Sequence, residues 1–266
     1  YTFIVTISSI LHTGATPWVF DLNYKDFNLD ISKIERQIKF QCIKKGNYYY
    51  HKKSKKRIFA ICPVFSFSII PNLKEINRFA KKFNLKIIFD AACSFGAKYK
   101  NFSVTKFADI SIFSFNGNKS LTTGAGGLLS TNNKTFFSRA EKLSQNGKNI
   151  KDSYTYDVIG HNYKMSNLHA SIGISQLKKF QEIKFRKNKV RQIYEKAFDK
   201  NNITILPKIK NSNYILWINC IITKNKNYTK KIILLLNNLR IESKLFWKPM
   251  HKQKSIKNKL LIDKNL

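Results

Sequence analysis

The chain has 266 residues, of which 43% are hydrophobic, enough apolar material for a globular fold with a large core rather than a disordered chain. Its formal net charge is +34, from 49 basic and 15 acidic residues, which raises the hypothesis of a nucleic-acid-binding surface. The basic residues are spread along the chain without an arginine cluster or a recognised nucleic-acid module, so the pattern favours a compositional bias toward lysine.

Membrane and metal functions have little support in the sequence. The longest wholly aliphatic stretch, residues 232–236, is far too short to span a bilayer, and no signal-peptide pattern opens the chain. The four cysteines, Cys42, Cys62, Cys93 and Cys220, show neither CxxC nor Cys/His spacing. We therefore expect no metal site and no disulfide framework, and this cysteine usage favours a reducing cytoplasm.

Strand and helix patterns alternate along the first half of the chain. The helix at residues 71–83 carries the strongest signal, because its apolar residues recur on one face, and Pro71 suits its first turn. The residues on that face are Leu73, Ile76, Phe79, Ala80 and Phe83. The other expected elements are short strand or strand-to-helix segments at 1–9 and 17–21, a helix near 31–40 and strands at 57–63, 86–89, 110–115 and 127–131.

The second half predicts two helices in succession. Residues 166–180 form the first, and the lysine-rich residues 178–200 continue as a helix toward a second domain. The residues expected to face inward are Leu168, Ile172, Leu177 and Phe180. A strand at 214–223, a helix at 229–239 and a strand at 242–246 follow. Repeated strand–helix–strand units predict an α/β fold with a mostly parallel sheet covered on both faces, in a large domain at 1–178 and a smaller one at 179–266.

A serine, a lysine and a glycine-rich turn follow one another in the middle of the chain. Ser114 lies five residues before Lys119, glycines follow at 124, 126 and 127, and another strand ends on Asp90, 29 residues before the lysine. These groups can hold pyridoxal phosphate: an amine that forms a Schiff base with the aldehyde, a carboxylate for the pyridine nitrogen, and a hydroxyl for the phosphate. Ligands of parallel sheets collect at the carboxyl ends of strands, where Asp90 and Ser114 fall. The alternatives are a surface lysine in a tight turn and an Asp90 that caps a helix.

Four segments resemble one enzyme family. They are 87–96 (IIFDAACSFG), 108–115 (ADISIFSF), 113–127 (FSFNGNKSLTTGAGG) and 157–168 (DVIGHNYKMSNL). In this order they resemble the DegT-type nucleotide-sugar aminotransferases, and the resemblance runs from residue 1 to about residue 253. Within the family, residues 116–119 (NGNK) and 246–251 (FWKPMH) look most like enzymes that aminate C4 of 4-keto-6-deoxy sugars, with perosamine and legionaminic-acid pathway enzymes as the nearest comparison.

The resemblance implies roles for individual residues. It makes Lys119 the cofactor-binding and catalytic lysine, Asp90 the partner of the pyridine nitrogen, and Ser114 a ligand of the phosphate. Cys93 stands where relatives often carry a residue that contacts the cofactor's 3-hydroxyl, although a plain buried thiol is the alternative. Phe3 resembles the aromatic residue that stacks on the cofactor ring, although a strand phenylalanine is usually in the core.

Other family positions match less completely. Asn162 and Lys164 match a segment that reaches across a dimer interface toward the neighbour's phosphate. Here lysine replaces the usual arginine, which keeps the charge but loses the bidentate fork. Ala125 stands where many relatives have glutamate or glycine, which leaves the substrate contacts of that turn open. His251 is either close to the sugar nucleotide or a surface histidine.

The resemblance implies a homodimeric fold-type-I aminotransferase with pyridoxal phosphate as cofactor. It would transfer an amino group, from glutamate, to the keto carbon of a nucleotide-linked 4-keto-6-deoxy sugar, which a positive protein would help to collect. Amination at C3 and a catalytically silent regulatory relative are alternatives, and a nucleic-acid-binding protein is the alternative that rests on charge alone. A dehydratase of the same family would place histidine at the position of Lys119, so the lysine argues against it.

By the same resemblance, both ends of the chain look truncated. Residues 1–6 resemble a segment that some tens of residues normally precede, among them a Gly-Thr-Ala turn that binds the cofactor phosphate. We therefore expect an internal fragment of a longer enzyme, with a large domain that lacks its start and a second domain that stops early.

Overall fold

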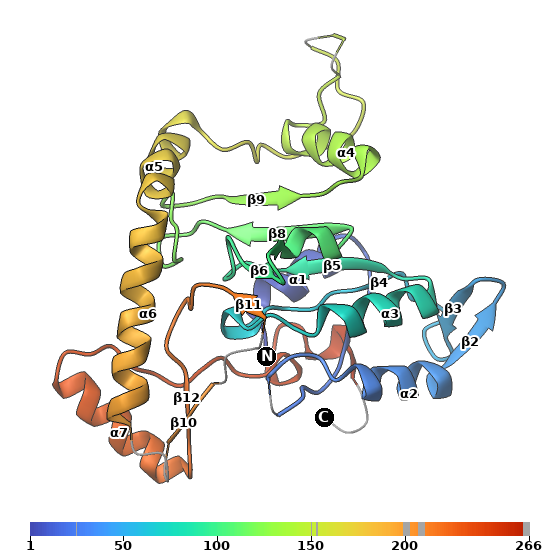
Figure 1. Cartoon of the computed structure of the whole chain (residues 1–266). Coiled ribbons are helices and arrows are strands. Elements are labelled where there is room, and N and C mark those ends of the chain that lie inside the picture. Colours follow the sequence, from blue (N-terminus) through green and yellow to red (C-terminus); the bar gives the residue numbers. More distant parts are fainter. Residues whose placement is uncertain (25, 150, 153, 199–202, 207–210, 263–266) are drawn as a thin grey trace.

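The centre of the molecule is a four-stranded sheet (Figure 1). The computed structural model describes residues 1–24, 26–149, 151–152, 154–198, 203–206 and 211–262. The strands of the sheet, in spatial order, are Ala60–Ile61 (β4), Lys86–Asp90 (β5), Ile110–Ser114 (β8) and Gly127–Ser130 (β9). The first three are parallel, and β9 runs antiparallel to β8. The mostly parallel α/β sheet predicted from the sequence is confirmed, although the strand expected at 57–63 is only two residues long.

The helix α3, Leu73–Phe83, matches its prediction closely because both of its ends are capped. The Asn72 side chain accepts a hydrogen bond from the Glu75 amide, and Asn84 closes the other end with a left-handed φ of 51°. All five residues of the predicted apolar face are buried. The helix begins later than expected, since Asn72 is the N-cap and Pro71 precedes it.

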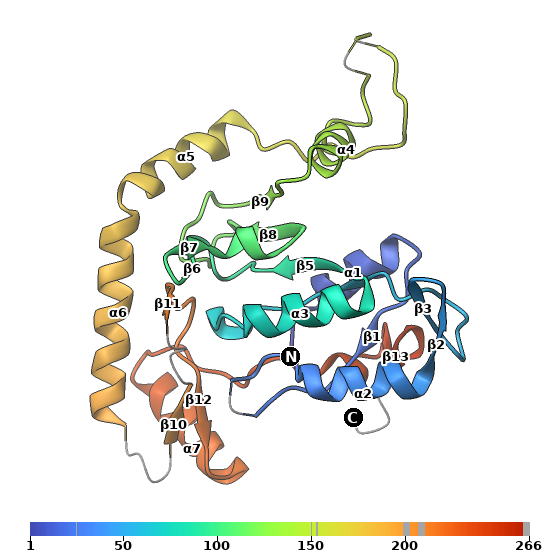
Figure 2. The same ribbon diagram turned by 45° about the vertical axis from the view of Figure 1, so that its right-hand side comes forward.

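Two further helices cover this core. Helix α2, Ile31–Gln41, packs on α3, and Figure 2 shows α3 between the sheet and α2. Helix α1, Ile4–His12, packs through Ile7 against Met250 and Ile256, a second and smaller core. Residues 1–9 are therefore helical from Ile4 onward rather than a strand, and the N-terminal segment is held by residues from the far end of the chain.

Several elements were not anticipated from the sequence. Most are strands too short to carry a pattern of their own: a hairpin of Cys42–Lys45 (β2) and Tyr48–His51 (β3), and an antiparallel group of Lys98–Tyr99 (β6), Phe102–Ser103 (β7) and Ser212–Asn213 (β11). The helix Lys134–Ser144 (α4) was also missed, and it has no buried residue. The strand Trp18–Val19 (β1) lies in the segment 17–21, where a short strand was expected, and it pairs in parallel with Leu261–Ile262 (β13). The 3-10 helices are Ser66–Ser68, Val104–Phe107, Met250–Lys252 and Lys257–Lys259.

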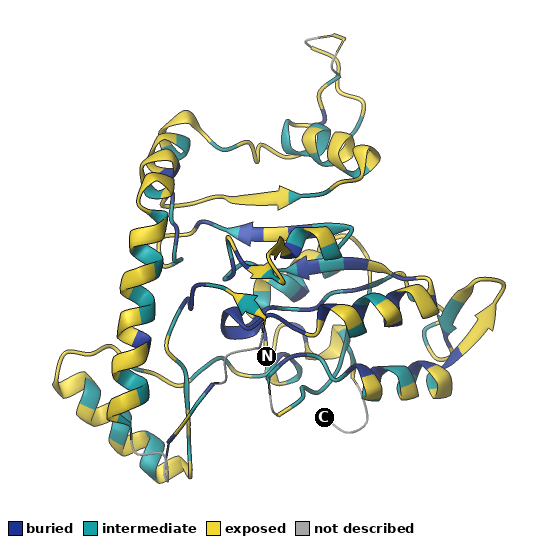
Figure 3. Ribbon diagram, viewed as in Figure 1, coloured by how far each residue is buried: buried dark blue, intermediate teal, exposed yellow. Residues whose placement is uncertain are grey.

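The two predicted helices at 166–200 are present, but the orientation predicted for the first is wrong. They are Asn167–Lys178 (α5) and Phe180–Ala197 (α6), which together run along one side of the molecule (Figure 1). Three of the four residues expected inside are exposed in the chain: Leu168 by 72%, Ile172 by 41% and Leu177 by 51%. Figure 3 shows much of α5 in the colour of exposed residues. The fourth, Phe180, is partly buried, and its ring packs against that of Phe95 in the loop after β5. The apolar side chains of α5 are distributed around the helix rather than gathered on one face, which is why the predicted orientation fails.

The strands of the C-terminal part differ from those predicted. Helix α7, Lys226–Asn238, is close to the helix expected at 229–239. The strand expected at 214–223 is confined to Ile221–Thr223 (β12), paired with Ile203–Ile205 (β10), and residues 242–246 form no strand. The physical reason is that these segments are held by side chains rather than by a ladder: the Trp217 amide donates to a serine hydroxyl, and Phe246 packs on Phe67.

No helix within the described ranges is long and apolar enough to cross a membrane. Within the same ranges no group of three or more His, Cys, Asp or Glu side chains could hold a metal ion. The division of the chain between residues 178 and 179 stays a prediction, although the break between α5 and α6 falls at that point.

Candidate active site

Asp90 is the last residue of β5, and its carboxylate is held on both oxygens. Its main chain pairs with residues 63 and 65 at the carboxyl end of the parallel sheet. The Thr6 hydroxyl of α1 donates to Oδ2 at 2.6 Å, and the Ala92 amide donates to Oδ1 at 3.1 Å. No helix follows Asp90, so the helix-cap alternative is wrong. The carboxylate is therefore oriented by two fixed donors while each oxygen keeps a lone pair for a further donor.

Lys119 extends from the turn after β8 toward the loop after β5. Its Nζ donates to Cys93 Sγ at 3.2 Å and lies 4.3 Å from the centroid of the Trp217 ring. Lys119 is partly buried, and its amine lies beside the partly buried Cys93 and the buried Trp217 rather than extending freely into solvent. Among the described residues, no ion pair includes either Lys119 or Asp90.

Cys93 lies near both charged groups. Burial raises the pKa of the Cys93 thiol, the Lys119 ammonium lowers it, and the Asp90 carboxylate raises it again, so both charged groups lie close enough to act on one sulfur. The net direction is upward, which keeps Cys93 a neutral thiol that can accept a hydrogen bond from the lysine. The structure thus brings Asp90, Cys93 and Lys119 into one site.

Ser114 ends β8 at the same edge of the sheet. Its Oγ accepts a hydrogen bond from the Asn116 amide at 3.3 Å, which leaves the hydroxyl hydrogen free to donate. The glycine-rich turn that follows depends on Gly127, because a Cβ there would lie 2.6 Å from the Phe113 carbonyl oxygen and would push β9 away from β8. Ala125 is exposed in this turn.

The ring of Phe3 is not part of the core. Phe3 is 53% exposed at the start of α1, and its ring centroid lies 5.4 Å from that of Trp247. Trp247 in turn lies 5.8 Å from Trp217. A continuous aromatic group therefore joins the ring predicted to stack on the cofactor to the ring that contacts Lys119.

The remaining predicted positions are not joined to this site within the chain. Asn162 and Lys164 are exposed on the segment between α4 and α5, where the backbone of Asn162 pairs with Gln145. His251 is partly buried in the 3-10 helix Met250–Lys252. Their predicted roles remain predictions.

Three neighbours of the site were missed by the sequence reasoning. Thr6 orients Asp90, Trp217 contacts Lys119, and Ser68 links the loops that carry Cys93 and Trp217. Ser68 and the preceding Phe67 have φ values of 68° and 58°, a left-handed conformation that is costly for residues other than glycine and often found near functional sites. Of these residues, only Trp217 could have drawn attention in the sequence, because tryptophan is rare and the chain has only three.

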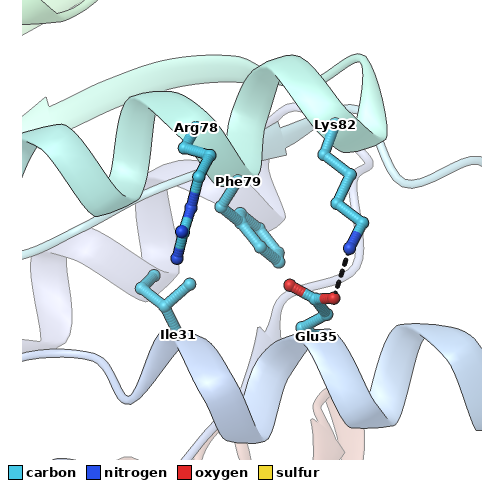
Figure 4. A pocket seen from close by; sticks show the side chains of 5 residues that line it. All are labelled: Ile31, Glu35, Arg78, Phe79 and Lys82. Atoms are coloured by element: carbon cyan, nitrogen blue, oxygen red, sulfur yellow. Dashed lines mark hydrogen bonds and ion pairs between the residues drawn. The ribbon is translucent and has the colours of Figure 1, made fainter.

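The residues present suit pyridoxal phosphate. Within the described part of the chain, a carboxylate and an amine that form no ion pair, together with a serine hydroxyl whose hydrogen is free, match the three polar ends of that molecule. Phe3 presents an exposed ring that is linked through Trp247 to Trp217. By contrast, the groove of about 280 Å³ between α2 and α3 (Figure 4) includes none of these residues, and its Glu35 is already paired with Lys82.

Comparison with known proteins agrees with this geometry. The model of the DegT/DnrJ/EryC1/StrS aminotransferase family matches residues 1–264. The chain belongs to this family. Among its relatives, GDP-perosamine synthase of Escherichia coli O157:H7 is 32% identical over 94% of the chain and 64% of the synthase. The UDP-4-amino-4,6-dideoxy-N-acetyl-beta-L-altrosamine transaminase of Campylobacter jejuni strain 81-176 is 33% identical over 79% of the chain and 52% of the transaminase.

A solved DegT DnrJ EryC1 StrS aminotransferase from Brucella abortus superposes with a TM-score of 0.87 at 22% identity, over 99% of the chain and 67% of that protein. This likeness confirms the predicted fold-type-I architecture. The chain spans 64% and 52% of the length of the two curated relatives, so what a whole relative does is not carried over by similarity alone.

Proposed function

We propose that the protein is an aminotransferase that moves an amino group, from L-glutamate, to C4 of a nucleotide-linked 4-keto-6-deoxy sugar. The observation that carries the proposal is that Lys119 and Asp90 both lie near Cys93 at the carboxyl end of the parallel sheet, the lysine within hydrogen-bond distance of its sulfur. The names of the GDP-perosamine synthase and of the altrosamine transaminase support an amino sugar as the product class.

Pyridoxal phosphate, predicted from the lysine segment, is the cofactor of the DegT family. When bound, it supplies an electron sink that no amino acid side chain provides. In this chain Lys119 would hold it covalently, Asp90 would face its ring nitrogen and Ser114 its phosphate, with Phe3 against the ring and Cys93 near the lysine.

Each of these side chains has a task that follows from its contacts. Lys119 Nζ, once displaced by the amino donor, would be the base that takes the proton from the donor's α-carbon and the acid that gives it back. Asp90, oriented by Thr6 and Ala92, would keep the ring nitrogen protonated through its negative charge. Ser114 would donate a hydrogen bond to the phosphate, a charge-assisted contact worth about 1.5–3 kcal/mol.

A homodimer is part of the proposal. Leu168 and Ile172, four residues apart on one face of α5, are left exposed by the described chain, as is Leu177 further along the helix, and such apolar side chains are stabilised when a second copy covers them. The same segment leads to Asn162, which would then reach the partner's cofactor phosphate. Light scattering at several protein concentrations tests the assembly state, with Leu168→Glu expected to give monomers.

The proposal is tested by locating the cofactor and then the product. Borohydride reduction of the purified protein with pyridoxal phosphate, followed by peptide mapping, should place the label on Lys119, and a label on any other lysine would refute the assignment. Mass spectrometry of reactions with glutamate and matched 4-keto and 3-keto nucleotide sugars should find the amine only from the 4-keto substrate. Product from the 3-keto sugar alone would replace C4 by C3.

A further inference from the structure

Trp217 makes a set of contacts that no stabilising role in the core requires. Trp217 is only 8% exposed, and each of its polar groups forms a hydrogen bond with a different part of the chain. Its indole Nε1 donates to the Asn118 carbonyl at 2.7 Å, its amide donates to Ser68 Oγ at 3.0 Å, and its carbonyl accepts from Lys187 Nζ at 2.9 Å. A side chain held at both ends in this way has one available position.

These contacts close a circuit around Lys119. The Ser68 hydroxyl that accepts from the Trp217 amide also donates to the Cys93 carbonyl at 2.7 Å, and Cys93 Sγ accepts from Lys119 Nζ. The face of the Trp217 ring lies against the same Nζ, while its edge holds the residue just before Lys119. One tryptophan therefore restrains both the backbone and the amine of the lysine.

We propose that Trp217 is a positioning residue for Lys119. Trp217 would hold the lysine amine against its ring face and beside Cys93 after the amine has left the cofactor. A long lysine side chain gains conformational freedom when released, and a free amine that turns out into water is no longer next to the carbon whose proton it moves. The ring face attracts the ammonium electrostatically, and no carboxylate of the described residues is paired with it. The reaction step rests on the proposed function, but the placement of the amine does not.

The strain at Ser68 fits the same interpretation. Ser68 is fully buried and adopts φ +68°, after Phe67 at φ +58°. Two consecutive left-handed residues that are not glycine persist only where their surroundings determine them. The Ser68 hydroxyl forms two hydrogen bonds that join the Cys93 loop to Trp217. A glycine would adopt this φ without strain but could not form them.

The placement can be tested without cofactor and without turnover. Trace acetylation of the cofactor-free protein, read for each lysine by mass spectrometry, reports how freely each amine reacts. Lys39 and Lys86, whose ion-pair partners Glu35 and Asp109 lie outside the Trp217 contacts, serve as internal references. An ammonium held on an aromatic face is favoured by a factor of roughly 2 to 30. Trp217→Leu should therefore raise the acetylation of Lys119 relative to the references by a factor in that range.

Matched variants separate the contributions. Trp217→Phe keeps a ring face but loses the indole N–H, so its increase should be clearly smaller than that of Trp217→Leu. Trp18→Leu removes a tryptophan that packs on Phe20 and His51 instead, and should leave the Lys119 ratio at the wild-type value. If Trp217→Leu leaves the ratio unchanged, or if Phe and Leu raise it equally, the ring does not hold the amine and the proposal is wrong.

A second variant keeps the test decisive if Trp217→Leu does not fold. Ser68→Ala removes the hydroxyl that fixes the Trp217 backbone and should raise the Lys119 acetylation ratio as well, and an unchanged ratio would overturn the proposal.

In the protein loaded with cofactor, Trp217→Phe should lower kcat about tenfold and change KM for the keto sugar by less than about threefold, because the indole contacts the lysine. Failure of wild-type protein to carry the borohydride label on Lys119 would sink the proposed function, while the acetylation ratios would still decide the placement.

Discussion

Replacement of Asp90 by asparagine separates the charge of this residue from its shape. In Asp90→Asn the amide oxygen can still accept from Ala92, and the Thr6 hydroxyl can turn to accept from the new NH₂ group while it donates to Thr2, with which it already shares a hydrogen bond. Two charge-assisted bonds become neutral ones, at a cost of about 1 kcal/mol each, and an uncharged amide is easier to bury. The variant should therefore remain folded, since domains have about 5–15 kcal/mol of stability.

Turnover of the same variant should fall by about a thousandfold. Two unit charges in contact at about 4 Å attract each other by about 4 kcal/mol at an effective dielectric constant of 20, and each 1.36 kcal/mol corresponds to a factor of ten in rate. The assay compares kcat with glutamate and keto sugar for wild-type, Asp90→Asn and Thr6→Val protein, after circular dichroism has shown that all three are folded. Thr6→Val, which loses one donor but keeps the charge, should lose only about tenfold to a hundredfold. A folded Asp90→Asn protein within tenfold of wild type would remove the carboxylate from the mechanism.

Three further changes have expected outcomes that rest on separate observations. Lys119→Ala should abolish both turnover and the borohydride label, and recovery of the label at another lysine would contradict the assignment. Gly96→Ala should cost about 1–3 kcal/mol more in chemical denaturation than Gly14→Ala, because both glycines have positive φ but only at Gly96 would a Cβ lie 2.7 Å from the Phe180 ring. Burial raises the pKa of the Cys42 thiol to about 11, so the unfolded chain releases that proton first as pH rises above about 9. The Cys42 contribution to the free energy of unfolding should then fall by at most about 1.4 kcal/mol per pH unit between pH 9 and 11. Cys42→Ala should make the measured slope shallower by that amount, while the other buried thiols, whose pKa values burial also raises, keep their own contributions.

The parts of the fold that the sequence predicts are those with local causes. Helix α3 has an apolar face of period 3.6, a capping asparagine before it and a left-handed asparagine after it, so its pattern and its ends agree. Asp90 and Ser114 were found because parallel strands end at one edge of a sheet, which places two distant residues together without further information.

The errors come from partners that a sequence pattern does not contain. The apolar positions of α5 were assigned to the interior, yet Leu168 and Leu177 are exposed, because periodicity tells which residues avoid water and not which chain covers them. Residues 214–220 have the composition of a strand, but the Trp217 amide bonds to Ser68 instead of to a neighbouring strand. A contact between residues 149 positions apart has no local signal.

The electrostatic arrangement of the site explains why its carboxylate and its lysine lie near each other without pairing. If Asp90 and Lys119 formed an ion pair, each would neutralise the other, and neither would be available for a ring nitrogen or an aldehyde. Cys93, kept neutral by burial, lies near both and accepts from the lysine, while Trp217 offers the ammonium a face instead of a charge. The carboxylate in turn is satisfied by hydrogen bonds from Thr6 and from a backbone amide, which stabilise its charge without cancelling it. Neutral groups thus orient the Asp90 carboxylate and the Lys119 amine without pairing them, so both remain available to a cofactor. This distinguishes the site from the ion pairs elsewhere on the protein.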